Sequence, residues 1–192
     1  MKLVILDRDG VINEDSDHYI KSAEEWQPIP GSIEAIAQLT QLGYTVAVAT
    51  NQSGIGRGFY SLDMLAAMHE KMNALVQAAG GTIAAIHYCP HHPEDDCECR
   101  KPRTGLVRQI EQTLDTSAQN AWFVGDTLKD IEVARRSGCR PVLVKTGKGM
   151  GTLDTLESLN TPHKHNPFED VTVFADLHGF AAFLREQSKG IM

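Results

Sequence analysis

Residues 2–10 read Lys-Leu-Val-Ile-Leu-Asp-Arg-Asp-Gly, an apolar run that leads directly into two carboxylates. The continuous apolar run at residues 3–6 is typical of a parallel strand that is covered on both faces. Ligands of open α/β sheets bind at the carboxyl ends of the strands. Asp7 and Asp9 would therefore lie where a metal or a reaction could use them. Two aspartates at this position could also merely cap a loop or helix, so the rest of the chain has to decide.

Short apolar runs alternate with amphipathic stretches, which predicts an α/β fold. Strands are expected at residues 3–6, 46–49, 83–88, 121–124, 142–144 and 171–174. Helices are expected at residues 32–42, 62–79, 106–114, 130–137 and 177–187. This alternation favours a doubly wound parallel sheet flanked by helices, with right-handed crossovers. Residues 14–30 and 147–167 fit neither pattern, and we interpret them as a long loop and a surface excursion.

Length and charge limit the classes of protein to consider. The 192 residues are expected to form one domain, 1–192, with a hydrophobic core of its own. The formal net charge of -7 argues against nucleic acid or an anionic membrane as the main partner. No apolar run approaches the ~20 residues of a membrane span, and the first strand begins too early to leave room for a signal peptide. We expect a cytoplasmic protein, monomeric because no long heptad pattern is visible.

Polar groups also follow the second apolar run, where residues 50–58 read Thr-Asn-Gln-Ser-Gly-Ile-Gly-Arg-Gly. A hydroxyl, two amides and a glycine-rich turn at the end of a strand can bind an oxyanion. The alternative interpretation is a plain polar loop.

A further carboxylate, Asp126, follows Gly125 at the end of the fourth predicted strand. It would lie at the same sheet edge as Asp7 and Asp9. Three converging carboxylates suit Mg²⁺, which takes oxygen ligands and keeps waters and phosphate oxygens in its shell. Asp130 could belong to this site or cap the next helix, and the sequence supports both equally.

Arg100 and Lys101 precede Pro102, which fixes the chain just before a predicted helix. Lys101 could balance the charge of a phosphoryl group and of a nucleophilic carboxylate. Arg100 could bind a more distant phosphate with two parallel hydrogen bonds. An ordinary solvated basic pair is the alternative.

Residues 89–99 read Cys-Pro-His-His-Pro-Glu-Asp-Asp-Cys-Glu-Cys. In a reducing compartment such clustering indicates a metal rather than disulfides, although free thiols are the alternative. A complete tetrahedral Zn²⁺ set leaves no open position, so the zinc would be structural and would stabilise the loop before Arg100. His91 is favoured over His92 because its spacing mirrors that of the last two cysteines. The predicted zinc ligands are Cys89, His91, Cys97 and Cys99.

The order of these segments resembles the haloacid dehalogenase superfamily of phosphotransferases over about residues 1–150. The resemblance implies a Rossmann-like sheet without a large cap domain, an aspartyl-phosphate intermediate and a required Mg²⁺. Asp7 would be the nucleophile and Asp9 the general acid/base. Thr50 and Lys101 would hold the phosphoryl group. Magnesium would be bound by Asp7, by the backbone carbonyl of Asp9 and by Asp126.

The segments D-R-D-G-V-I-N, T-N-Q-S-G-I-G-R-G, C-P-H-H-P and C-R-K-P resemble a narrower branch, which contains sugar-bisphosphate and histidinol-phosphate phosphatases. This implies a small-molecule sugar bisphosphate as substrate, in carbohydrate metabolism that supplies bacterial lipopolysaccharide. Histidinol phosphate is the nearest alternative. A polynucleotide 3′-phosphatase is disfavoured because the chain has no basic stripe, and a sugar-phosphate binding protein without turnover is a further alternative. The residues implied to touch the substrate are Asp15, Tyr19, Asn51, Gln52, Ser53 and Arg100.

Overall fold

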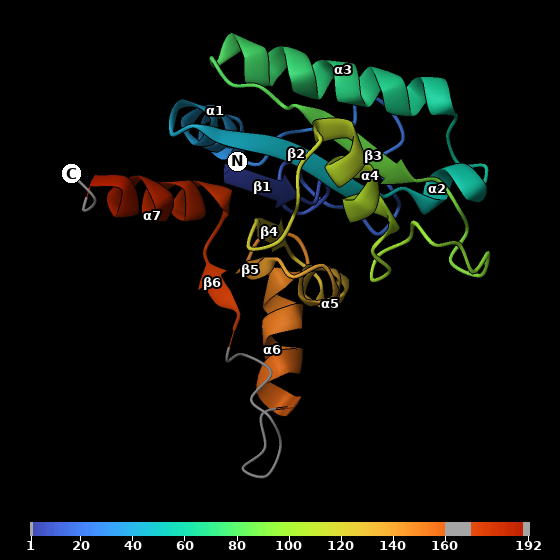
Figure 1. Cartoon of the computed structure of the whole chain (residues 1–192). Helices are drawn as coiled ribbons and strands as arrows, with labels where there is room; N and C mark the ends of the chain where they lie inside the picture. The colour runs from blue at the N-terminus through green and yellow to red at the C-terminus, as the bar shows by residue number, and fades with distance from the viewer. Residues whose placement is uncertain (1, 160–169, 190–192) are drawn as a thin grey trace.

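The computed structural model describes residues 2–159 and 170–189, and these form an α/β fold (Figure 1). The six strands of the described part form one parallel sheet in the order β3-β2-β1-β4-β5-β6. Because β1 lies between β2 and β4, residues that follow these three strands meet at one edge of the sheet. The strands are β1 (Lys2–Leu6), β2 (Tyr44–Asn51), β3 (Ala85–Cys89), β4 (Trp122–Gly125), β5 (Arg140–Val144) and β6 (Thr172–Phe174).

Helices cover both faces of the sheet, as the sequence predicts. On one face α1, α3 and α7 share a core with Val4 and Leu6 of β1. On the other face α4 and α5 share a core with Leu3 and Ile5. In residues 2–159 and 170–189 no helix is long and apolar enough to cross a lipid bilayer. The helices are α1 (Ser32–Gln41), α2 (Ser53–Gly56), α3 (Leu62–Ala78), α4 (Gly105–Leu114), α5 (Leu128–Arg136), α6 (Gly149–Leu159) and α7 (Leu177–Lys189).

The predicted surface excursion at residues 147–167 is wrong for the part that forms α6, shown in orange in Figure 1. This segment is rich in glycine and threonine, which are weak helix formers. It is helical because Leu156 is buried in a small apolar cluster with Ile131 of α5. Tertiary packing therefore outweighs intrinsic propensity here. Residues 160–167 of the predicted excursion lie outside the described residues.

The end of β2 also differs from the prediction. The strand continues through Thr50 and Asn51, and Ser53 begins the short helix α2. Part of the predicted glycine-rich turn is therefore helical. Gly56 is required at its position because a Cβ there would lie 2.8 Å from the carbonyl oxygen of Pro90 in the cysteine-rich loop. This close approach packs α2 against that loop.

The long loop at residues 14–30 is held against the sheet edge from two sides. Trp26 is fully buried, and Lys71 of α3 donates to the backbone carbonyls of Ala23 and Trp26, at 2.7 Å in both cases. On the other side Lys148 forms an ion pair with Asp15 at 3.1 Å. These contacts bring the start of the loop to the functional site.

Candidate functional site

The residues that follow β1, β2 and β4 line one pocket of about 270 Å³. Its wall also includes Tyr60, Lys129 and Lys148, which sequence reasoning missed because nothing in their local sequence marks them. Every residue predicted to act in catalysis, substrate binding or magnesium binding contributes to it: Asp7, Asp9, Asp15, Tyr19, Thr50, Asn51, Gln52, Ser53, Arg100, Lys101 and Asp126.

Three buried carboxylates converge at the base of this pocket. One oxygen from each of Asp7, Asp126 and Asp130 lies within 4.8 Å of the others, a set that could hold a metal ion. Gly10 makes the approach possible because its φ is +80° and because a Cβ there would collide with the Asp126 carboxylate. Hard oxygen ligands packed this closely suit Mg²⁺.

Asp130 fills both of the roles that the sequence left open. It caps α5, since its Oδ2 accepts from the Thr127 backbone amide at 3.0 Å and from the Thr127 hydroxyl at 2.6 Å. Its Oδ1 accepts from the Nζ of Lys101 at 2.7 Å. Asp130 therefore joins the start of α5 to the basic residue of the site.

Lys101 balances the charge of this cluster. Its side chain is 2% exposed, and its Nζ lies 2.9 Å from Asp7 Oδ2. Burial would lower the pKa of Lys101, but Asp130 and Asp7 outweigh burial and raise it, so the side chain stays charged. Burial raises the pKa of Asp7 to about 7, although Lys101 opposes the shift. Burial and the charge of Asp7 raise the pKa of Asp126 to about 8.

The Asp9 side chain lies in a different environment from that of Asp7. Its carboxylate turns away from the cluster and accepts from Asn13 at 2.8 Å, from Gln52 at 2.8 Å and from Arg8 at 2.9 Å. Burial would raise the pKa of Asp9, but the Arg8 charge and these hydrogen bonds outweigh burial and lower it. The two aspartates of the opening motif therefore differ in proton affinity, with the pKa of Asp7 raised and that of Asp9 lowered.

The side chain of Asn51 is hydrogen-bonded to the backbone of Lys101, in the loop that carries Arg100 and Lys101 (the basic loop). Its side-chain amide donates to the Lys101 carbonyl at 3.2 Å, and its side-chain oxygen accepts from the Lys101 backbone amide at 3.0 Å. This pair of hydrogen bonds fixes Lys101 beside the end of β2. In this structure Asn51 therefore positions the basic loop.

Comparison with known proteins places the chain in a family of hydrolases. The HAD-hydrolase-like family model matches residues 98–176. A relative from Neisseria meningitidis, named D-glycero-beta-D-manno-heptose-1,7-bisphosphate 7-phosphatase, is 47% identical over 188 residues, which are 98% of this chain and 97% of that protein. The chain belongs to the haloacid dehalogenase-like hydrolases. A relative of the same name from Pseudomonas aeruginosa is 60% identical over 151 residues, or 79% of this chain and 85% of that protein.

A solved haloacid dehalogenase-like structure extends the likeness to the fold. The D,D-heptose 1,7-bisphosphate phosphatase from Bordetella bronchiseptica, complexed with magnesium and phosphate, is 44% identical and superposes with a TM-score of 0.88. The match covers 97% of this chain and 99% of that chain. The family and its phosphatase relatives place this chain among the enzymes that hydrolyse phosphoric monoesters.

This haloacid dehalogenase-like hydrolase has a second cluster that could hold a metal, in the loop after β3. The sulfur atoms are spaced as in a tetrahedral site, because bonds of about 2.3 Å to zinc place neighbouring sulfur ligands roughly 3.8 Å apart. The Sγ atoms of Cys89 and Cys97 are 3.5 Å apart, and those of Cys97 and Cys99 are 3.6 Å apart. His91 Nδ1 lies 3.1 Å from Cys99 Sγ and completes the cluster, whereas His92 lies outside it.

The cysteine cluster connects directly to Arg100. Burial would raise the pKa of the Cys97 thiol, but hydrogen bonds from the Arg100 backbone and the neighbouring thiols bring it to about 7. Burial raises the pKa of Cys89, and burial together with the other two thiols raises that of Cys99. Thiolate is the form that binds a metal. The Arg100 side chain lines the pocket, and its buried Nη1 has no hydrogen-bond partner within the described residues. This donor is available to an acceptor on a ligand.

Proposed function

We propose that this enzyme removes the 7-phosphate from D-glycero-β-D-manno-heptose 1,7-bisphosphate, on the route to the nucleotide-activated heptose of bacterial lipopolysaccharide. The relatives that match nearly the whole chain carry the name of this activity. The observation that carries the proposal is the arrangement of Asp7, Asp126 and Lys101 at the base of a pocket whose rim is basic. One phosphate would react at the base, and the other would be bound at the rim.

A magnesium ion fits the carboxylate cluster. Asp7, Asp126 and the backbone carbonyl of Asp9 would hold it. Asp130 is engaged by Lys101 and by the cap of α5, so we assign it to positioning Lys101. When bound, Mg²⁺ supplies positive charge that offsets the repulsion between the carboxylates and the phosphoryl oxygens.

The two aspartates would divide the reaction between them. An Asp7 oxygen attacks phosphorus, and the bond from phosphorus to the sugar oxygen breaks as Asp9 gives that oxygen a proton. Water then attacks the aspartyl-phosphate, and Asp9 takes a proton from the water. The bond between phosphorus and Asp7 breaks, which restores Asp7 and releases phosphate. Proton transfer of this kind contributes about 10²- to 10⁴-fold in rate.

The groups around the transferred phosphate supply positioning and charge, on which phosphoryl transfer depends. Thr50 and Lys101 would hold the phosphoryl oxygens. Arg100, with its unpartnered Nη1, would bind the second phosphate. The sugar would lie between the two phosphates, in contact with Asp15, Tyr19 and Ser53. Gln52, also predicted to touch the substrate, lines the pocket, but its amide is hydrogen-bonded to protein groups.

We further propose that the cysteine cluster binds one structural Zn²⁺. All four ligands come from the protein, so no position is left open for chemistry. The metal would fix the loop that delivers Arg100 and Lys101. We expect the enzyme to act as a monomer on a small molecule, without a nucleic acid or membrane partner.

A panel of phosphate esters tests the proposed function. Both anomers of the heptose 1,7-bisphosphate are compared with histidinol phosphate, and phosphate release is measured with wild type and with Asp7→Asn. We expect a heptose bisphosphate to give the highest kcat/KM, since Arg100 and Lys129 in the pocket wall favour a second anion over the ammonium of histidinol phosphate, whereas Lys148 is paired with Asp15. Asp7→Asn should release no phosphate while keeping its fold. Faster hydrolysis of histidinol phosphate would overturn the assignment.

A further inference from the structure

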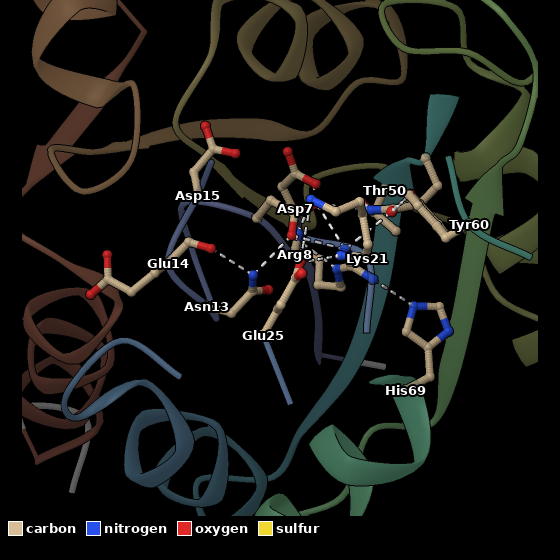
Figure 2. A network of polar contacts seen from close by, with 12 residues as sticks. Asp7, Arg8, Asn13, Glu14, Asp15, Lys21, Glu25, Thr50, Tyr60 and His69 are labelled. Atoms are coloured by element: carbon tan, nitrogen blue, oxygen red, sulfur yellow. Dashed lines mark hydrogen bonds and ion pairs between the residues drawn. The ribbon is translucent and has the colours of Figure 1, made fainter. Parts of the chain in front are cut away.

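Arg8 is a fully buried cation between the two aspartates, with 0% of the residue exposed. Figure 2 shows its guanidinium reaching toward His69 of α3, and all three of its side-chain nitrogens have partners. Nε and Nη2 donate to the Asp9 carboxylate at 3.2 and 2.9 Å. Nη2 also donates to Gln52 Oε1 at 3.1 Å, and Nη1 lies 3.4 Å from His69 Nε2. Arg8 therefore fixes the Asp9 side chain by hydrogen bonds, and Gln52 and His69 in turn fix Arg8.

Gln52 has its orientation fixed by four contacts. Its Nε2 donates to Asp9 Oδ2 and to Thr50 Oγ1, at 2.8 Å in both cases. Its Oε1 accepts from Arg8 and, at 2.5 Å, from the Tyr60 hydroxyl. These contacts use both donors and both acceptor sites of the amide. A rotated amide would place donors against donors, so Gln52 holds Asp9 in one place.

His69 supports Arg8 from α3. Burial, together with the Arg8 charge, lowers the pKa of His69 to about 4. The imidazole is therefore neutral near pH 7, and its Nε2 accepts the Nη1–H of Arg8. The ring also lies 6.0 Å from the ring of Tyr88, centroid to centroid. His69 thus limits the positions open to the guanidinium without touching the phosphate pocket.

A buried ion pair gives little net stability, since desolvation of the two charges offsets their attraction. The Arg8–Asp9 pair is better explained by orientation. We infer that Arg8, supported by His69 and Gln52, is a positioning residue that aims the Asp9 carboxylate at the oxygen of the leaving group. This inference rests on the proposed phosphatase function and on the role of Asp9 within it.

The inference predicts a loss that depends on the leaving group. A sugar alkoxide is a poor leaving group and needs the proton of Asp9 as the ester bond breaks. A p-nitrophenolate leaves without that proton. The ratio kcat/KM covers the steps up to departure of the leaving group. A misaimed Asp9 should therefore reduce kcat/KM for the sugar ester and change it little for p-nitrophenyl phosphate.

The test compares kcat/KM for heptose 1,7-bisphosphate and for p-nitrophenyl phosphate. We expect Arg8→Met to lose about 100-fold and His69→Phe about tenfold with the sugar substrate, within the range of acid–base catalysis. Both should lose less than about threefold with p-nitrophenyl phosphate, where the proton is not needed. His69→Gln, which keeps an acceptor for Arg8, should restore most of the loss. His87→Phe is the matched control, because it removes a hydrogen bond to Thr113 of α4, which covers the opposite face of the sheet from α3.

The outcomes separate this inference from the proposed function. If wild type hydrolyses neither compound, the proposed function fails and the inference fails with it. If wild type is active and the variants lose equally on both substrates, only the inference is overturned. His69→Phe keeps the ring beside Tyr88 and leaves Arg8 in place, so it provides this test even if Arg8→Met does not fold.

Discussion

Replacing Lys101 by methionine removes the cation that lies between two buried carboxylates. The Nζ atom is 2.9 Å from Asp7 and 2.7 Å from Asp130, whose side chains are 13% and 1% exposed. Breaking a buried ion pair by removal of one partner typically costs about 3–5 kcal/mol. We expect Lys101→Met to lose about that much free energy of unfolding at pH 8.5 in magnesium-free buffer.

The loss should shrink as the pH falls. The pKa of Asp7 is already raised to about 7, and Lys101 lowers it, so the variant should titrate higher still. A carboxyl whose folded pKa is raised favours the folded state when protonated, and this contribution is lost as the pH rises through the folded pKa. At pH 5.5 Asp7 is mostly protonated in both proteins. The difference between wild type and variant should then be roughly half of its value at pH 8.5, or less.

Urea unfolding, followed by the fluorescence of Trp26 and Trp122, measures both free energies. Lys129→Met is the matched control, because it removes the same charge from the same pocket wall and Lys129 forms no ion pair with any described residue. It should change the free energy of unfolding by less than about 1 kcal/mol. Equal losses in the two variants, or a Lys101→Met loss that is the same at both pH values, would refute the charge-balance argument.

Three further predictions concern the metals and the rim of the pocket. The pKa values of Asp7 and Asp126 are raised to about 7 and 8, so protons compete with Mg²⁺ for these carboxylates. Added Mg²⁺ should therefore raise Tm more at pH 9 than at pH 6, and equal shifts would contradict the carboxylate site. Metal analysis of purified protein should find about one zinc per chain; no zinc, with all of the cysteine thiols titratable, would exclude the structural zinc. Arg100→Met should raise KM for the sugar bisphosphate by about 10- to 100-fold and leave kcat/KM for p-nitrophenyl phosphate unchanged. Arg108→Met, on the exposed side of α4, should change neither value.

The sheet and the centre of the site could be predicted because both depend on local patterns. Apolar runs mark the strands, and polar residues directly after β1, β2 and β4 must meet when those strands are neighbours. The cysteine spacing likewise predicts the cluster that the loop forms.

The parts that sequence reasoning missed depend on contacts between distant segments. In the sequence, nothing distinguishes Arg8 from any residue placed between two aspartates. In the structure Arg8 is buried against His69, which is 61 residues away in the sequence. Lys148 precedes a segment whose local sequence does not favour a helix, and the packing of Leu156 is what makes that segment helical. Such long-range packing leaves no local periodicity to read.

The central claim, that Asp7 forms a covalent aspartyl-phosphate, can be tested by chemical trapping. Borohydride reduces an acyl phosphate to an alcohol and leaves a free carboxylate unchanged. Wild-type enzyme would be mixed with substrate and Mg²⁺, quenched with borohydride during turnover, digested and sequenced by mass spectrometry. We expect homoserine at position 7 only when substrate is present. Rapid substrate hydrolysis with an unmodified Asp7, or with the reduced residue at another position, would contradict it.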